Sequence, residues 1–372
     1  MLEWLGHGGD WVTFAERYPE TTDVIDFSAN INPLGPPPAV REQWPHLWPS
    51  LTRYPDARQR RLSAMLAARH GLTDDHVLVT NGGAEAIDLL LRALAPGKVG
   101  IVEPCFAEYR QAAQRAGARV VASVVSESTE GFVIPFSRVE QLLAEVDVLI
   151  LGNPNNPTGM LWPRDQLLAL AERAARGNCH LLIDEAFLDF LPQEDQLTMI
   201  SAAASGAPVS VVRSLTKMYA IPGVRLGYMV ASPALIVRCR ALQTPWSVNG
   251  VAQIVGQLAL DDRDFVAQTR QWLSQERAWF LAALRENLAE WLAPVPMPGP
   301  VNYVLLKLRR PEWTDVQLQH HLAERGIIVR ACRTFLGMGT SYVRVAVRLR
   351  EENEQLIRVL KQLMQSDLHH ST

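Results

Sequence analysis

Between about residue 60 and about residue 245, short apolar runs alternate with longer stretches whose apolar residues recur at helical spacing. The run "HVLVT" leads into "NGGAEAIDLLLRAL", and "KVGIVEP" leads into "CFAEYRQAAQRAG". Further along, "VDVLILG", "HLLIDE" and "PVSVVRS" are the next apolar runs. Strands that alternate with helices indicate βα units on a mostly parallel sheet. The sequence therefore predicts an α/β fold in which helices flank such a sheet.

Polar residues cluster where these apolar runs end. They form four segments, namely Asn81–Gly83, Asn153–Asn156, Asp184 and Ser214–Lys217. In open α/β sheets, ligands bind at the carboxyl ends of the strands. We therefore expect these four segments, although distant in sequence, to converge on one site.

Three parts of the chain differ in their pattern. Residues 1–50 are irregular and rich in proline, which predicts an arm, and residues 51–250 carry the alternating pattern of a large domain. Residues 251–372 contain the long helical stretch "DRDFVAQTRQWLSQERAWFLAALREN". Strand-like runs such as "VNYVLLKL" and "YVRVAVR" follow, and then a final amphipathic helix. This last part predicts a small α+β domain.

Composition argues against several classes of function. The 372 residues carry a formal net charge of −3 without a basic block, so nothing favours nucleic acid or an acidic membrane as partner. The four cysteines are far apart and lack metal-ligand spacing, so neither a metal site nor a disulfide framework is expected. The first residues lack the basic and apolar pattern of an export signal, and no apolar run is long enough to span a bilayer. We expect a cytoplasmic enzyme.

Lys217, in "RSLTKMYAIPGVRLGY", has three possible interpretations. These are a surface lysine after a strand, the lysine of a Ser-x-x-Lys nucleophile motif, and a Schiff-base lysine. Penicillin-binding enzymes pair Ser-x-x-Lys with Ser-Asp-Asn and Lys-Thr-Gly elements, and neither tripeptide occurs in this chain. The residues around Lys217 favour the Schiff-base lysine.

Pyridoxal phosphate requires an amine, an acid, a phosphate cradle and an aromatic face. Lys217 supplies the amine, and Asp184, at the end of an apolar run, supplies an acid for the pyridine nitrogen. The segment "NGGAEA" opens a helix, whose first backbone N–H groups bind phosphate, and Ser214 and Arg225 can complete that cradle. Phe106 follows a strand and can stack on the ring. Each signal is weak alone, but their order and spacing together are specific.

Four motifs of the chain resemble those of the fold-type I pyridoxal-phosphate enzymes of the aspartate aminotransferase superfamily. They are "NGGAEAI", "NPNNPTG", "DEAF" and "SLTK…GVRLGY". The histidinol-phosphate aminotransferase-like branch is the most similar group, over essentially the whole chain. This resemblance implies a seven-stranded, mostly parallel sheet. It also implies that Lys217 binds the cofactor aldehyde, Asp184 the ring nitrogen and Asn156 the ring 3′-oxygen. The residues implied around the cofactor phosphate are Gly83, Ala84, Ser214, Thr216 and Arg225, and the ring-stacking residue is Phe106.

Three further positions follow from the same resemblance. Tyr54, in "LTRYPD", matches a tyrosine that reaches the cofactor phosphate of a partner subunit, which implies a homodimer with shared active sites. Arg344, in "YVRVAVR", matches the arginine that binds the substrate carboxylate. The aminotransferases usually have a tyrosine at the position of Phe187, so one hydroxyl donor to the 3′-oxygen is absent in this chain.

A narrower set of motifs, "HGG", "DFSANINPLG", "FAEY", "DEAFLDF" and "PWSVN", resembles the L-threonine-O-3-phosphate decarboxylase family of cobalamin biosynthesis. These relatives of the aminotransferases remove the α-carboxylate and leave (R)-1-aminopropan-2-yl phosphate and CO2. The resemblance implies that the N-terminal arm contributes to the active site and to the small domain. The substrate-binding residues that it implies are His7, Gly8, Asn30, Asn156, Arg330 and Arg344.

Two other functions remain open from the sequence. A histidinol-phosphate or related aminotransferase would use the same scaffold, whereas Phe187 and the motifs "HGG" and "SANINPLG" favour the decarboxylase. A cofactor-binding regulator on this fold would carry an added DNA-binding domain. The chain has only about 50 proline-rich residues before the core and no basic helix, which argues against the regulator.

Overall fold

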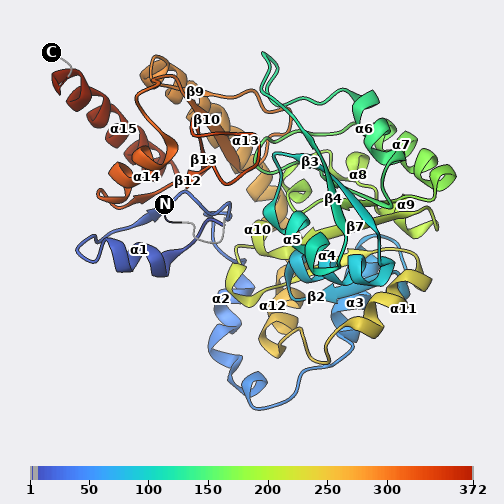
Figure 1. The fold of residues 1–372 in the computed structure, drawn as a ribbon. Coiled ribbons are helices and arrows are strands. Elements are labelled where there is room, and N and C mark those ends of the chain that lie inside the picture. Colours follow the sequence, from blue (N-terminus) through green and yellow to red (C-terminus); the bar gives the residue numbers. More distant parts are fainter. Residues whose placement is uncertain (1, 3–6, 371–372) are drawn as a thin grey trace.

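The computed structural model describes Leu2 and residues 7–370, with side chains through residue 365. A seven-stranded sheet lies at its centre (Figure 1). Its strands are β2 (Val77–Thr80), β3 (Lys98–Glu103), β4 (Arg119–Val124), β5 (Val148–Gly152), β6 (His180–Asp184), β7 (Val209–Ser214) and β8 (Gly227–Val230). They lie in the order β2-β8-β7-β6-β5-β3-β4, and only β8 runs antiparallel to its neighbours in this sheet. The predicted α/β fold with a mostly parallel sheet is confirmed.

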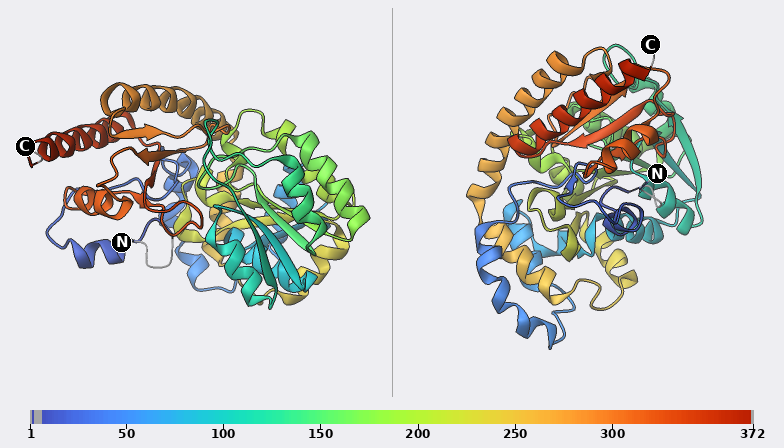
Figure 2. Two further views of the ribbon diagram at one scale, coloured as in Figure 1. Left: turned by 45° about the horizontal axis from the view of Figure 1, so that its top comes forward. Right: turned by 90° about the vertical axis from the view of Figure 1, so that its left-hand side faces the viewer.

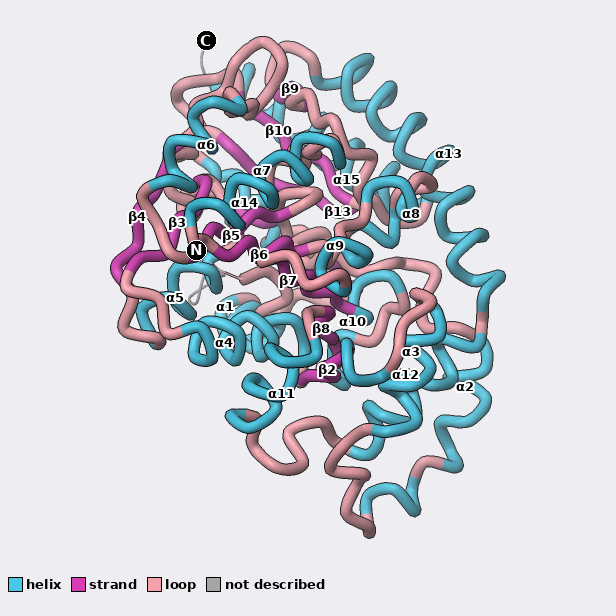
Figure 3. Tube along the Cα trace, turned by 90° about the vertical axis from the view of Figure 1, so that its right-hand side faces the viewer, coloured by secondary structure: helices cyan, strands magenta, loops and turns pink. Residues whose placement is uncertain are grey.

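Helices cover both faces of this sheet, which explains why its strands are nearly continuous apolar runs (Figure 2, left, and Figure 3). In β5, Val148 and Ile150 belong to the cluster formed with α4, α5 and α11. Leu149 and Leu151 alternate with them and belong to the cluster on the other face. The helices of the first face are α4 (Gly82–Leu94), α5 (Ala107–Arg115) and α11 (Pro233–Leu242). Those that contribute to the other cluster include α3 (Arg60–Arg69), α6 (Phe136–Ala144), α7 (Arg164–Gly177) and α9 (Ile200–Ala204).

A second, antiparallel sheet is formed by the C-terminal part of the chain. Its strands are β9 (Leu292–Pro294), β10 (Tyr303–Leu308), β12 (Arg330–Ala331) and β13 (Tyr342–Ala346), in the order β12-β13-β10-β9. The accompanying helices are α13 (Arg263–Leu288), α14 (Asp315–Ala323) and α15 (Arg350–His370). Asp262 caps α13 by accepting from the backbone N–H of Phe265, and Thr314 and Gln317 form a capping box at α14.

The N-terminal arm lies against this second sheet rather than standing apart (Figure 1, blue beside orange and red). Strand β1 (Ile25–Asp26) pairs in parallel with β11 (Ile327–Ile328), and the backbone N–H of Ala346 donates to the carbonyl of Phe27 at 2.8 Å. The other elements of the arm are α1 (Trp11–Arg17), α2 (Pro38–Gln43), η1 (Trp44–His46) and η2 (Trp48–Leu51). The first and last parts of the sequence thus meet in space.

We propose that the chain divides into an arm (1–50), a large domain (51–250) and a small domain (251–372), and the separate sheets support this division. The remaining elements are η3 (Asp74–His76), η4 (Leu188–Phe190), α8 (Glu194–Leu197), α10 (Leu215–Met218), η5 (Pro222–Val224) and α12 (Gly250–Asp261). Among the described residues, no helix has the length and apolarity needed to cross a membrane.

The carboxyl ends of β5, β6 and β7 are aligned. Gly152 is in register with Asp184, and Asp184 with Val212. The hydrogen-bond pattern continues one residue beyond the strands, because the N–H of Asn153 donates to the carbonyl of Asp184 at 2.8 Å and that of Glu185 to the carbonyl of Val212 at 2.8 Å. This register brings Asp184 and the segments that begin at Asn153 and Ser214 to one edge of the sheet, as the sequence predicts.

Candidate active site

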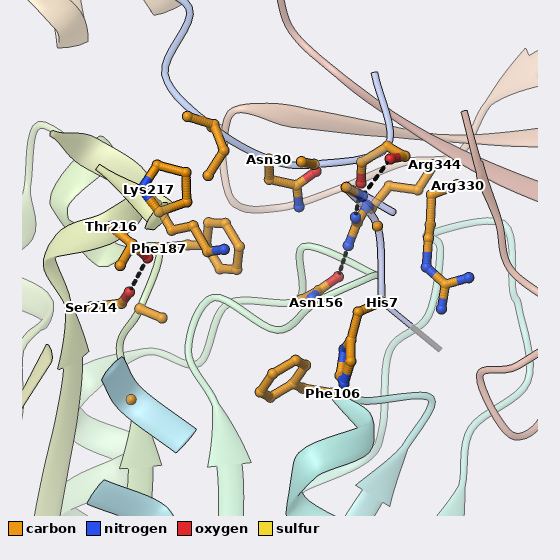
Figure 4. Close-up of a pocket in the computed structure, with 18 of the residues that line it drawn as sticks. His7, Asn30, Phe106, Asn156, Phe187, Ser214, Thr216, Lys217, Arg330 and Arg344 are labelled. Carbon is orange, nitrogen blue, oxygen red and sulfur yellow. Dashed lines mark hydrogen bonds between the residues drawn. The ribbon is translucent and has the colours of Figure 1, made fainter. Parts of the chain in front are cut away.

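A cavity of about 670 Å³ lies where this edge of the large sheet meets the arm and the second sheet (Figure 4). Every residue that the sequence assigns to the site lines this cavity except Tyr54. These lining residues are His7, Gly8, Asn30, Gly83, Ala84, Phe106, Asn156, Asp184, Ser214, Thr216, Lys217, Arg225, Arg330 and Arg344. The convergence predicted from the strand ends is therefore present, and residues of the arm and the second sheet complete the wall.

Lys217 lies in α10, the short helix that follows β7. Burial, together with the charges of Arg344 and Arg225, lowers the pKa of its amine to about 8, and the nearby Asp184 carboxylate opposes this shift. An amine with a lowered pKa loses its proton more readily and becomes a nucleophile. Arg225 therefore acts on Lys217 electrostatically, besides lining the cavity.

Asp184 is the last residue of β6, and both of its carboxylate oxygens accept hydrogen bonds. Tyr109 donates its hydroxyl to Oδ2 at 2.8 Å, and the backbone N–H of Ala186 donates to Oδ1 at 3.0 Å. Burial raises the pKa of Asp184, while these two hydrogen bonds and the charge of Lys217 oppose the rise. A buried carboxylate in this position is best stabilised by a cation, and the protonated nitrogen of a pyridine ring would be one.

Glycines keep a hollow open at the start of α4. A Cβ added to Gly82, where φ is +79°, would lie 2.5 Å from Nη2 of Arg225. A Cβ on Gly227 would lie 2.7 Å from the backbone nitrogen of Gly83. The first N–H groups of a helix have no partner within it and favour an anion. Side chains larger than hydrogen would fill this space, so the hollow fits a phosphate group.

Two hydroxyls and a guanidinium surround the same hollow. Ser214 Oγ and Thr216 Oγ1 lie 2.7 Å apart and share a hydrogen bond, and both line the cavity with Arg225 (Figure 4). Arg225 has a left-handed backbone with φ of 57°, directly after the turn of Pro222–Val224. The donors suit a phosphate dianion, and together with Lys217 and Asp184 they fit pyridoxal 5′-phosphate.

Arg344 connects three parts of the structure. From β13, it donates to Oδ1 of Asn156 and, at 2.6 Å, to the backbone carbonyl of Ser28 in the arm. Its guanidinium also lies over the ring of Tyr303, 5.4 Å from the centroid. Because the oxygen of the Asn156 amide accepts from Arg344, the amide nitrogen of Asn156 is the group left to donate to a ligand.

Arg330 is almost completely buried, yet it lines the cavity. It donates to the carbonyl of Ala331 and to Oγ1 of Thr334, both at 2.6 Å, and lies over the ring of Phe335 at 4.8 Å. Figure 4 shows Arg330 and Arg344 on one side of the site, with Lys217, Thr216 and Ser214 on the other. Two fixed guanidinium groups at one end of a cavity suit a ligand with two anionic groups.

The two phenylalanines highlighted by the sequence analysis also face the cavity. Phe106 precedes α5 and contacts the ring of Tyr109 edge-on, with 5.7 Å between centroids. Phe187 packs edge-on against Tyr303 at 5.1 Å. The hydroxyl of Tyr303 donates to the backbone carbonyl of Asn155 at 2.7 Å, so it does not replace the donor that Phe187 lacks.

The arm covers one wall of the cavity. Nε2 of His7 lies 3.0 Å from Oε1 of Glu108. Gly8 lies so close to the arm that an added Cβ would be 2.2 Å from the carbonyl oxygen of Ser28. Asn30 is buried, and its Oδ1 has no hydrogen-bond partner within the described part of the chain. A buried amide oxygen without a partner is costly, and a ligand with a donor group would satisfy it.

Tyr54 does not line this cavity. Its side chain is 85% exposed, and its ring lies 4.9 Å from that of Trp246. Three other large apolar side chains of the same segment are exposed, namely Trp44, Trp48 and Leu51. An apolar surface of this kind is typical of a protein interface.

Other residues line the cavity without having been assigned by the sequence analysis, and among them are the polar residues Asp26, Glu108, Tyr109 and Arg348. Tyr109 had a usable signal, because it lies three residues after Phe106 and such a spacing brings residues to one side of a helix. Glu108 pairs with a residue 101 positions away in the sequence, and no local pattern indicates such a contact.

Comparison with known proteins identifies the family of this chain. The model of the family described as aminotransferase class I and II matches residues 22–360. A threonine-phosphate decarboxylase from Salmonella typhimurium is 38% identical over 92% of this chain and 91% of its own length. A histidinol-phosphate aminotransferase from Symbiobacterium thermophilum is 32% identical over 91% of this chain and 90% of its own. The crystal structure of the histidinol-phosphate aminotransferase from Clostridium acetobutylicum superposes with a TM-score of 0.81 at 27% identity, covering 91% and 99%. The chain therefore belongs to the aminotransferase class I and II family.

Proposed function

We propose that this protein decarboxylates L-threonine O-3-phosphate to (R)-1-aminopropan-2-yl phosphate and CO2, as a step of cobalamin biosynthesis. One observation supports this most strongly. A single cavity contains the cofactor-type residues Lys217 and Asp184 and, on its other side, the buried Arg330 and Arg344 with His7. The substrate has a phosphate and a carboxylate, two anionic groups that the two guanidinium groups suit. The relative from Salmonella typhimurium, a threonine-phosphate decarboxylase by name, supports the same choice.

The cofactor is pyridoxal 5′-phosphate, and the residues of the cavity fit it. Lys217 would hold the aldehyde carbon, Asp184 the ring nitrogen and Asn156 the 3′-oxygen. The phosphate would lie in the hollow at the start of α4, between Gly83, Ala84, Ser214, Thr216 and Arg225. When bound, the cofactor supplies an aldehyde for an amine and a ring that accepts an electron pair from the substrate α-carbon.

The side chains of this protein select which bond at the α-carbon breaks. Arg330, Arg344 and His7 bind the two anionic groups of the substrate and so fix its orientation. Because the phosphate is remote from the reacting carbon, its binding energy can be used to turn the carboxylate into the reactive position. Lys217, with its lowered pKa, then delivers a proton to the α-carbon from its Nζ atom.

We also propose a cytoplasmic homodimer in which Tyr54 reaches the cofactor phosphate of the partner subunit. The exposure of Tyr54, which stands away from the cavity of its own chain, supports this role. The exposed Trp44, Trp48 and Leu51 supply apolar area for the interface.

The alternative function is that of a histidinol-phosphate or related aminotransferase, and the relative from Symbiobacterium thermophilum supports it. Two assays on the cofactor-loaded protein separate the alternatives. The first measures CO2 released from L-threonine O-phosphate, and the second measures amino transfer from histidinol phosphate to 2-oxoglutarate. We expect rapid CO2 release and at most slow amino transfer. The reverse result would replace the decarboxylase with the aminotransferase.

A further inference from the structure

Glu108 places a carboxylate in the wall of the cavity, beside His7. It lies in the first turn of α5 and accepts a hydrogen bond from Nε2 of His7 at 3.0 Å. Its other oxygen accepts from Nη2 of Arg115 at 3.3 Å. Arg115 in turn donates from Nε to Asp88 at 2.8 Å. Glu108 is thus shared between a histidine of the arm and an arginine of its own helix.

The contact with Glu108 determines which nitrogen of the His7 ring carries a hydrogen. The hydrogen bond from His7 is the main reason why the pKa of Glu108 is lowered, so this carboxylate is ionised at neutral pH and only accepts. Nε2 of His7 must therefore carry a hydrogen. The second ring nitrogen, Nδ1, is not part of this contact and can donate to an anion only when it carries a hydrogen as well.

His7 is also fixed at its backbone. Gly8 packs directly on the carbonyl of Ser28, and the N–H of Gly9 donates to Oγ of Ser28 at 2.8 Å. The same carbonyl of Ser28 accepts from Arg344. The arm therefore holds the backbone beside His7 next to Arg344, while Glu108 holds the end of the side chain. The ring of His7 lies 5.5 Å from that of Phe106, which places it within the cavity wall (Figure 4).

Building on the proposed function, we propose that Glu108 is a positioning residue for the phosphate group of the substrate. It holds the His7 ring against the cavity wall through Nε2, which leaves Nδ1 as the ring nitrogen for the phosphate. At the same time, the hydrogen bonds from His7 and Arg115 occupy both oxygens of Glu108, which would otherwise repel an anionic substrate. The pair therefore forms part of the specificity for phosphorylated amino acids.

A purely local role for Glu108 is the competing explanation. An acidic residue in the first turn of a helix interacts favourably with the helix dipole, and this effect does not depend on His7. The two explanations differ in their prediction for a double-mutant cycle. If Glu108 acts through His7, its replacement weakens phosphate binding only while His7 is present. Without His7, Glu108 is a repulsive carboxylate, and its replacement no longer weakens binding.

The experiment compares the cofactor-loaded wild type with Glu108→Gln, His7→Gln and the double variant. Glu172→Gln is the matched control, because Glu172 is exposed on α7, outside the cavity lining. Calorimetric titration with inorganic phosphate measures the anion site beyond the bound cofactor. Steady-state CO2 release gives KM and kcat for L-threonine O-phosphate. We expect Glu108→Gln to weaken phosphate binding and to raise KM by about tenfold, with kcat within about twofold of the wild type.

In the His7→Gln background, the further change Glu108→Gln is expected to leave the affinity for phosphate unchanged or to increase it slightly. Equal weakening of phosphate binding in both backgrounds would overturn the proposal in favour of the local role. Behaviour of Glu108→Gln like that of Glu172→Gln would overturn it too, as would failure of the wild type to bind inorganic phosphate. If the coupling in phosphate binding is present but the wild type releases no CO2 from L-threonine O-phosphate, the proposed function fails while an anion site built by His7 and Glu108 stands.

Discussion

The hydroxyl of Tyr109 donates to Oδ2 of Asp184 at 2.8 Å, while the ring of the same tyrosine supports Phe106 edge-on. One side chain of α5 thus contacts both the acid assigned to the ring nitrogen and the aromatic residue assigned to the ring face. Tyr109 would therefore hold Asp184 and Phe106 in a fixed relation to each other around the proposed cofactor ring.

Tyr109→Phe tests this relation, because it keeps the ring but removes the donor to Asp184. We expect kcat to fall by about tenfold with little change in the substrate KM, since the lost hydrogen bond is to Asp184 and not to Arg330 or Arg344. The visible absorption of the bound cofactor is expected to change as well. The matched control is Tyr228→Phe, which removes a buried hydroxyl that lies 2.8 Å from Nε2 of His70, outside the cavity lining. Equal losses of kcat in the two variants would contradict a specific role for Tyr109.

The lowered pKa of Lys217 predicts a pH dependence for the cofactor-free protein. Its pKa of about 8 lies below the ordinary value of 10.5, so the amine becomes reactive as the pH rises through about 8. Labelling of Lys217 with an amine-specific acylating reagent, followed by mass spectrometry, should be half-maximal near pH 8. It should fall about tenfold for each pH unit below that value, because only the neutral amine reacts. A labelling profile identical to that of the exposed Lys98 would contradict the shift.

The same shift predicts the direction of a change in stability with pH. The folded state binds the proton of Lys217 less tightly than the unfolded state does. Between pH 8 and pH 10.5, the unfolded state therefore carries more protons at this site, and the contribution of Lys217 to the free energy of unfolding rises with pH. Comparing the pH dependence of unfolding by urea in wild type and Lys217→Met checks the sign. A contribution that falls in this interval would contradict the assigned shift.

Much of the fold follows from the sequence, because the apolar runs that form β2, β5, β6 and β7 are buried on both faces and end in polar residues. The positions of Lys217 and Asp184 follow from the same pattern. The buried ionic cluster around Arg213 does not. This arginine donates to Glu185, Asp189 and Glu194 at 2.7–3.0 Å. These contacts join strand β7 to the segment after β6 that includes η4 and α8, so no single helical or strand periodicity indicates them, although they hold the ends of β6 and β7 together.

The arm was also only partly predictable. Proline-rich composition indicates irregular structure, but it does not say which surface the arm covers. The parallel pairing of β1 with β11 joins residues about 300 positions apart, and it brings His7 and Asn30 into the cavity. Their place in the site was expected only from the resemblance to a known family. The contact between His7 and Glu108 is a tertiary feature that neither residue signals locally.

Replacing either of the two buried arginines is expected to weaken substrate binding and to leave cofactor binding nearly unchanged. Replacing Arg330 or Arg344 with lysine keeps a charge but loses the planar fork, so KM for L-threonine O-phosphate should rise by about a hundredfold. The cofactor affinity, measured by titration of the cofactor-free protein, should stay within about threefold. Arg238→Lys serves as the control, because Arg238 lies on α11 and donates to the carbonyl of Ala93, outside the cavity lining. Equal losses of cofactor and substrate affinity would refute the assignment of Arg330 and Arg344.

If Tyr54 of each subunit completes the active site of the other, two inactive variants should restore activity when they are mixed. Lys217→Ala and Tyr54→Ala are each expected to be nearly inactive as pure proteins. In a mixed dimer, the site that keeps Lys217 receives the intact Tyr54 of the other chain, so one complete site forms. Random mixing of equal amounts should restore roughly a quarter of the wild-type activity. Mixtures that stay inactive, although native mass spectrometry shows hybrid dimers, would contradict the shared site.

The fate of individual substrate atoms tests the central claim most directly. L-Threonine O-phosphate is prepared with a heavy-carbon label in its carboxylate and a heavy-nitrogen label in its amine. It is then incubated with the cofactor-loaded protein and 2-oxoglutarate, and the products are followed by nuclear magnetic resonance. We predict that the labelled carbon leaves as CO2 and that the labelled nitrogen stays in (R)-1-aminopropan-2-yl phosphate, and that Lys217→Ala abolishes both signals. Transfer of the labelled nitrogen to glutamate, with the labelled carbon retained in the phosphorylated product, would contradict the account.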